Sequence, residues 1–208
     1  MSEYDPVFGP RDPGVGNADL DAARALFAAA SRPYLSSPVP WLSWAVLLPA
    51  AALATGAAAR AGSYVGVLGL WSAAILVGGG VEAFFLYRNR RRLGGSSLGS
   101  WAMTLQGNLS LVAVALSAAL VAADLARLLP GLWLLLLGHS LFALGGLAFR
   151  PQRTAGIVYQ VGGAIALLPG LPALVVFAAA TALGNLWIAI GVARSRRESP
   201  LAPTRSVA

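Results

Sequence analysis

Six apolar stretches dominate this sequence of 208 residues and restrict what it can fold into. Short segments that contain glycine, proline or arginine separate them, and the stretches lie at 41–59, 64–87, 101–123, 128–149, 154–168 and 173–192. A helix needs about 20 predominantly apolar residues to cross the hydrocarbon core of a bilayer. Five stretches satisfy this length. The stretch at 154–168 is short by roughly one turn, so its helix has to borrow residues from its flanks or thin the bilayer locally.

The composition supports a chain that lies mostly in lipid. Hydrophobic residues make up 57% of the sequence, charged residues only 11%, and the mean hydropathy is +0.70. A soluble domain of this size carries more charge to cover its surface. We therefore predict an all-α protein, a polytopic membrane bundle of six transmembrane helices, with a length that allows one compact bundle.

The arginines predict how the chain is threaded through the membrane. Cytoplasmic loops carry an excess of lysine and arginine, and all 15 basic residues here are arginine. If both termini are cytoplasmic, all but two arginines lie on the cytoplasmic side, and only Arg60 and Arg127 lie outside. The basic residues next to the apolar stretches, which we expect at lipid headgroups, are Arg88, Arg90, Arg91, Arg92, Arg150, Arg153, Arg194, Arg196 and Arg197.

Four segments follow from this pattern. Residues 1–16 are rich in proline, glycine and acidic residues, which is typical of a disordered tail. Residues 17–32 predict an amphipathic helix on the membrane surface, with a partner-docking helix as the alternative. Residues 38–194 form the transmembrane domain, and 195–208 a disordered basic tail. The first forty residues lack a cleavable signal peptide, and Gly94–Ser100 reads as a flexible loop.

Glycines inside the apolar stretches predict where helices approach closely, because small residues drive helix association in lipid. Gly131, Gly138 and Gly145 recur every seven residues, and Gly184 and Gly191 repeat this spacing in the last stretch. The run 78–80 contains three glycines and could act as a packing seam or as a hinge.

Polar side chains inside the apolar stretches are costly and therefore candidates for function. We expect most of them in the cytoplasmic half of the bundle and predict that they converge on a polar pocket open to the cytoplasm. The candidates are Glu82, Gln106, Asn108, His139, Gln160 and Asn185. In the alternative interpretation each amide bonds to a neighbouring helix, and Glu82 pairs with an adjacent arginine.

Catalytic, metal and cofactor sites find little support in the sequence. There is no cysteine, and His139 is the only histidine. No GxSxG, HExxH or P-loop motif occurs, and no carboxylate pair is placed for acid–base chemistry. We predict no catalytic residues, no metal and no cofactor. A haem or pigment held by His139 remains an alternative, since a histidine within the membrane can ligate either one.

Two stretches carry a resemblance to known proteins. Leu129–Leu144 (LPGLWLLLLGHSLFAL) and Ala182–Arg194 (ALGNLWIAIGVAR) resemble a group of uncharacterised bacterial membrane proteins. That group has the form of compact six-helix bundles and often accompanies small transcriptional regulators. It tends to have a glycine–histidine pair in the sixth span, where this chain has Asn185 and Leu186. The resemblance implies no activity and assigns no site residue.

The sequence favours a non-catalytic protein of the bacterial inner membrane. We expect its cytoplasmic face to bind a protein partner or larger complex and its arginines to contact anionic headgroups. We expect no nucleic acid partner, because the positive charge lies beside the apolar stretches. The alternatives are a carrier for a small solute or for protons that uses Glu82, Gln106 and His139, and the haem or pigment subunit.

Overall fold

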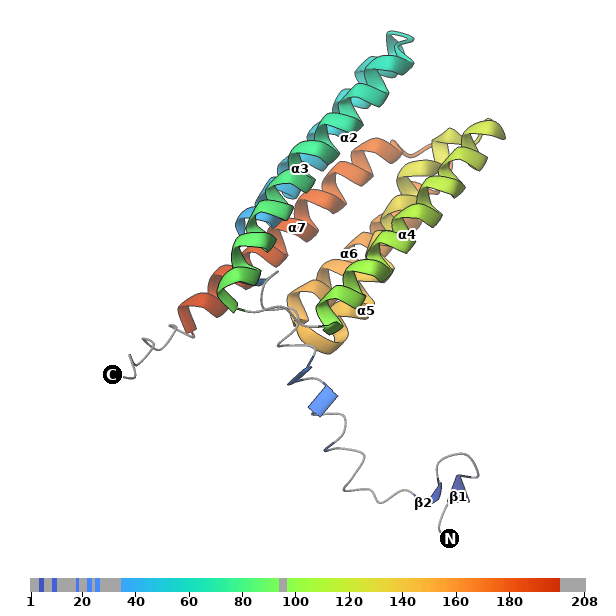
Figure 1. Cartoon of the computed structure of the whole chain (residues 1–208). Coiled ribbons are helices and arrows are strands. Elements are labelled where there is room, and N and C mark those ends of the chain that lie inside the picture. Colours follow the sequence, from blue (N-terminus) through green and yellow to red (C-terminus); the bar gives the residue numbers. More distant parts are fainter. Residues whose placement is uncertain are drawn as a thin grey trace.

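The structure, a computed structural model, describes residues 4–5, 9–10, 18, 22–23, 25–26, 35–93 and 97–198. Six long helices follow one another along this part of the chain (Figure 1). Their bounds are α2 Val39–Arg60, α3 Tyr64–Leu93, α4 Ser97–Ala122, α5 Leu129–Ala148, α6 Arg150–Ala166 and α7 Ala173–Glu198. A 3₁₀ turn, η1 (Ala126–Leu128), precedes α5, and β1 (Tyr4–Asp5) pairs antiparallel with β2 (Gly9–Pro10). The predicted all-helical bundle is confirmed at this level.

Four helical segments are long and apolar enough to cross a membrane: Val39–Arg60, Tyr64–Asn89, Ala126–Gly145 and Ala173–Arg197. In α4 the apolar segment found among the described residues, Gly107–Ala122, is shorter. Helix α6 has 17 residues, which corresponds to about 26 Å along the helix axis. The structure therefore supports a membrane protein, and six crossings remain a prediction.

Two predicted boundaries differ from the structure. Helix α6 begins at Arg150 and not at Thr154, because Pro151 lies at its N-terminal end, where a fixed φ and a missing N–H suit a helix start. Helix α4 begins at Ser97, inside the loop predicted for 94–100. Of the surface helix predicted for 17–32, the described residues 18, 22, 23, 25 and 26 are helical. The rest of that helix, most of the predicted tail 1–16 and the tail after 198 lie outside the described residues.

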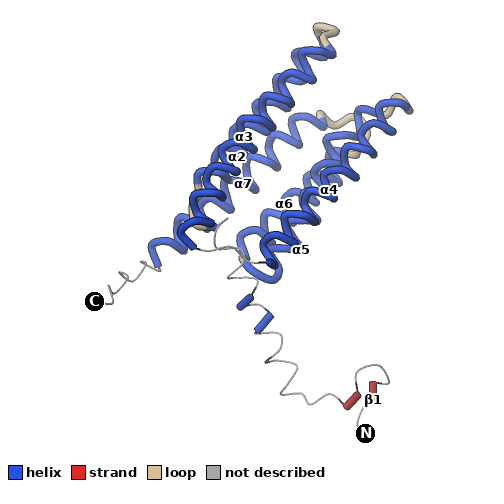
Figure 2. The backbone as a smooth tube through the Cα atoms, viewed as in Figure 1, coloured by secondary structure: helices blue, strands red, loops and turns tan. Residues whose placement is uncertain are grey.

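The helices are arranged as three antiparallel hairpins, α2–α3, α4–α5 and α6–α7. The turns that close them lie at the upper end of the view in Figure 2, where the loops are tan. Each turn contains one residue with positive φ, namely Gly62 (69°), Asp124 (60°) and Gly170 (81°). This left-handed backbone favours glycine, or a short polar residue such as aspartate. The opposite end of the bundle carries the α5–α6 junction and the arginine-bearing ends of α3 and α7.

Helix α7 lies at the centre of the bundle and packs against α2, α6 and α5. Its buried side chains include Phe177, Ile188 and Val192. Helix α3 packs mainly on α2, and α4 mainly on α5, so both lie at the periphery. Large exposed apolar side chains, such as Leu76 on α3 and Leu111 on α4, are 75% and 67% exposed. In water such surfaces would be costly, whereas in a bilayer they are covered by lipid.

The α5–α6 pair is the closest helix contact in the bundle, and glycine makes it possible. A Cβ atom on Gly138 would lie 2.9 Å from the backbone nitrogen of Gln160 and the carbonyl oxygen of Gly156. A Cβ atom on Gly163 would lie 3.0 Å from the carbonyl oxygen of Gly131. One residue, Phe149, links the two helices in an extended conformation. The seam predicted for Gly131, Gly138 and Gly145 is thus confirmed.

Candidate functional site

Glu82, on α3, forms a hydrogen bond to the neighbouring helix of its own hairpin. The indole N–H of Trp44, on α2, donates to Glu82 Oε2 at 3.0 Å. The indole ring can cross α3 at this level because it lies against Gly78, one turn before Glu82. A Cβ atom at Gly78 would come within 2.6 Å of the ring. This glycine therefore serves packing, and the carboxylate binds an indole instead of opening into a shared pocket.

Asn185, on α7, is 3% exposed and bonds within a different pair of helices. Its side-chain amide donates to the hydroxyl of Tyr159, on α6, at 2.7 Å and to the carbonyl oxygen of Thr181 at 3.0 Å. Tyr159 itself is 2% exposed, and its ring lies against Gly184. Both N–H groups of the amide thus have partners, and the tyrosine hydroxyl has one. The contact fixes α6 against α7.

Three of the other four candidates lie elsewhere, on α4, α5 and α6. His139 lies on an exposed part of α5, and Asn108 is exposed on α4. Gln160 is half-buried on α6, beside Gly138 of the α5–α6 seam. The side chain of Gln106 lies outside the described part of the structure. The described candidates are thus distributed over separate helix contacts and outer faces. Glu82 and Asn185 link neighbouring helices, as the alternative interpretation expects, whereas His139 and Asn108 are exposed.

Two further polar contacts recur with the same spacing and were not predicted. The indole of Trp71 donates to Thr55 Oγ1 at 2.9 Å, and that of Trp133 donates to Ser117 Oγ at 3.0 Å, each across 16 residues. Both hydroxyls donate in turn to the carbonyl four residues earlier, at 2.7 Å. The α2–α3 and α4–α5 hairpins therefore share one internal design. The repeated Gly-Leu-Trp sequence at 69–71 and 131–133 was the available signal.

Replacement of Trp44 by phenylalanine is expected to lower the free energy of unfolding in detergent by about 2 kcal/mol, because hydrogen bonds to a charged group contribute more than neutral ones. Trp71→Phe is the matched control, since it removes an equal ring volume and a bond to a neutral hydroxyl. We expect a loss of about 1 kcal/mol there. Denaturant titration followed by circular dichroism measures both, and equal losses would argue against a charged acceptor at Glu82.

The basic end of the bundle carries six exposed arginines. Arg88 ends the apolar part of α3, Arg150 and Arg153 open α6, and Arg194, Arg196 and Arg197 lie in the last turns of α7. All six side chains are exposed. The guanidinium of Arg153 lies 5.1 Å from the ring centre of Phe142, a cation–π contact. The side chains of Arg90, Arg91 and Arg92 lie outside the described residues.

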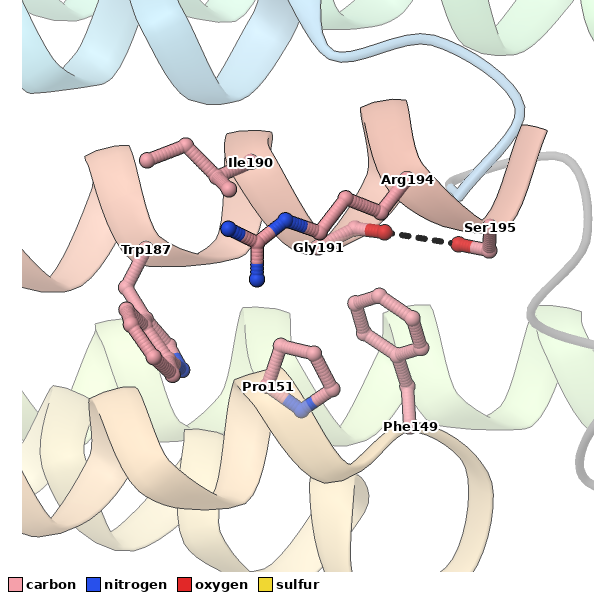
Figure 3. A pocket seen from close by; sticks show the side chains of 7 residues that line it. All are labelled: Phe149, Pro151, Trp187, Ile190, Gly191, Arg194 and Ser195. Atoms are coloured by element: carbon pink, nitrogen blue, oxygen red, sulfur yellow. Dashed lines mark hydrogen bonds between the residues drawn. The ribbon is translucent and has the colours of Figure 1, made fainter. Parts of the chain in front are cut away.

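A pocket of about 250 Å³ opens at this end, between α7 and the α5–α6 junction (Figure 3). Four of its lining side chains are apolar, and the two polar ones are Arg194 and Ser195. The lining includes Phe149, Pro151, Trp187, Ile190, Arg194 and Ser195. The backbone of α7 comes close to Pro151 here because residue 191 is glycine, whose Cβ would lie 2.6 Å from the proline ring. The sequence identified Arg194 as a headgroup contact but gave no sign of the pocket.

The fold and the distribution of charge define an all-helical bundle with four segments long and apolar enough for a membrane and with exposed arginines at one end. Comparison with family models, curated proteins and solved structures finds no match to this chain. The resemblance to uncharacterised six-helix membrane proteins therefore stays an expectation, and function has to be argued from the structure.

Proposed function

We propose that this chain is a non-catalytic protein of the bacterial inner membrane, with six crossings and both termini in the cytoplasm, that binds a protein partner through its basic end. The observation that carries the proposal is the common location of six of the eight described arginine side chains, at the ends of α3 and α7 and the start of α6. The turn end has two described arginines, Arg60 at the end of α2 and Arg127 three residues after Asp124. Positive charge flanking membrane helices is retained in the cytoplasm.

The interior supports a structural role over transport. A carrier needs polar groups along a path through the bundle, and these groups should be free to bind its solute. Here Glu82 accepts from Trp44, and Asn185 donates to Tyr159. Backbone-to-backbone contact at Gly138 and Gly163 leaves no room between α5 and α6. Glu82 and Asn185 thus stabilise helix pairs, and six exposed arginines lie at the basic end.

The partner expected for this end presents acidic groups, since arginine pairs well with carboxylates. Replacing Arg88 and Arg92 by glutamine should dissociate a complex isolated from native membranes. Replacing Arg60 and Arg127 removes the same charge from the opposite end and should leave that complex intact. The readout is the mass of the detergent-solubilised complex. If both double variants behave alike, the basic end is not the binding surface.

The threading can be tested cleanly because the natural chain has no cysteine. We expect Ser63→Cys, in the exposed α2–α3 turn, to react with a membrane-impermeant maleimide added to intact spheroplasts. We expect Ser206→Cys, near the C-terminus, to react only after lysis. Labelling of both sites in intact spheroplasts would contradict the proposed threading, and so would labelling of the C-terminal site alone.

A further inference from the structure

The pocket at the basic end combines one cation with a mostly apolar wall. Figure 3 shows the guanidinium of Arg194 above Pro151, with Trp187 on one side and Phe149 on the other. Of the two carboxylate side chains that the structure describes, Glu82 binds Trp44 and Asp124 lies in a turn at the far end. In Figure 3 the guanidinium of Arg194 is directed back along α7 towards Trp187, where its planar set of N–H donors faces the pocket, and a phosphate group fits such a donor set well.

Ser195 does not donate a hydrogen bond into the pocket. Its hydroxyl donates to the carbonyl oxygen of Gly191 at 2.7 Å, as the dashed line in Figure 3 shows. The proton of the hydroxyl is engaged within α7, so only oxygen lone pairs face the pocket. Among the described lining side chains, the guanidinium of Arg194 is then the one charged donor for a negatively charged oxygen, and the indole N–H of Trp187 is a second, neutral donor.

The apolar wall continues along the outer face of α7 towards the middle of the bundle. Leu183, Trp187 and Ile190 precede Arg194 at helical spacing and are 62%, 48% and 38% exposed. Residues three and four apart share one helix face. An extended hydrocarbon chain can therefore lie along this strip with its polar end at Arg194. A free anion without a hydrocarbon chain would make no contact with this apolar strip.

We propose that this pocket is a binding site for one anionic phospholipid, with its phosphate on the Arg194 guanidinium and one acyl chain along Leu183, Trp187 and Ile190. The volume of about 250 Å³ is below the roughly 300–1,000 Å³ of pockets that enclose a whole small ligand. It suits a headgroup phosphate and the adjoining carbons, with the chain lying outside. The proposal rests on the proposed function in one respect: the basic end has to lie at a membrane surface.

The test uses the full chain in detergent and native mass spectrometry during titration with phosphatidylglycerol. Arg194→Gln is expected to weaken binding of the first lipid at least ~10-fold, as expected for loss of a charge-assisted hydrogen bond. The matched control is Arg196→Gln, which removes the same charge from the same exposed end of α7 but does not line the pocket. It should change the affinity by less than ~2-fold, within the range of an exposed charge pair.

Two further measurements test the chemistry of the ligand. Phosphatidylcholine with the same acyl chains should bind more weakly than phosphatidylglycerol. Inorganic phosphate should fail to displace bound phosphatidylglycerol. Trp187→Ala should weaken lipid binding by removing part of the apolar wall. The proposal is overturned if both arginine variants lose affinity equally, if the two lipids bind alike, or if phosphate competes. The lipid affinity is measured in detergent without a protein partner, so failure of the partner proposal would leave it unchanged. Maleimide labelling tests the threading in a separate experiment.

Discussion

Replacement of Gly156 by leucine is expected to be among the most destabilising single changes in this protein, with a loss of about 3 kcal/mol in the free energy of unfolding. A Cβ atom at this position would lie 2.8 Å from the carbonyl oxygen of Gly138 and from the Cα atom of Phe142. Both are backbone atoms of α5, so no side-chain rotation can relieve the contact. The helices would have to separate along the whole seam, including Gly131 and Gly163.

Denaturant titration in detergent measures this loss, and Gly79→Leu on α3 provides the control. A Cβ atom at Gly79 meets no atom within 4 Å, and leucine has the higher helix propensity by roughly 0.8–1 kcal/mol. The control should therefore be neutral or slightly more stable than the natural chain. If Gly156→Leu unfolds at the same denaturant concentration as Gly79→Leu, then α5 and α6 are not packed backbone to backbone.

The second large effect is expected at the buried amide that joins α6 and α7. Asn185→Ala removes both hydrogen bonds of the side-chain amide, leaves the hydroxyl of Tyr159 without its described partner and opens a small void. An unsatisfied buried polar group costs about 1–3 kcal/mol, so we expect a loss of about 2 kcal/mol in the free energy of unfolding. Tyr159→Phe leaves the amide bonded to the carbonyl of Thr181 and should cost about 1 kcal/mol.

A double-mutant cycle of these two changes isolates the contact between them. Interhelical hydrogen bonds in membrane proteins give coupling energies of about 0.6 kcal/mol on average and reach roughly 1.7 kcal/mol. Because both groups here are almost completely buried and 2.7 Å apart, we expect a value near the upper limit. If the losses of the two single variants sum to the loss of the double variant, the two side chains do not interact.

Much of the fold could be predicted because the relevant signals are local in sequence. Apolar stretches bounded by glycine, proline or arginine predicted all six long helices. Glycine at every seventh position marks one helix face, so the seam through Gly131, Gly138 and Gly145 was visible before the structure. The segments at 60–63 and 169–172 were predicted to separate apolar stretches because glycine and proline favour turns, and they do separate helices in the structure.

The partners of the polar side chains could not be predicted, because they depend on how each helix is rotated and on which helices are neighbours. Glu82 and Asn108 lie at similar depth in their apolar stretches, but one bonds to α2 while the other is exposed on α4. The depth of a residue along its helix can be read from the local sequence. The direction in which its side chain faces depends on how the helices pack around α7, at the centre of the bundle. Tyr159 was missed as the partner of Asn185 for the same reason.

The shared design of the first two hairpins has a consequence for how the chain can be shortened. Each hairpin enters and leaves at the same end of the bundle and closes its tryptophan–hydroxyl contact within itself, through Trp71 in one and Trp133 in the other. With the six crossings proposed above, excising α2–α3 as a unit would leave an even number of crossings, and the C-terminus would stay on its original side of the membrane. Excising α3 alone would reverse every later helix, so truncations of this protein should be cut in pairs.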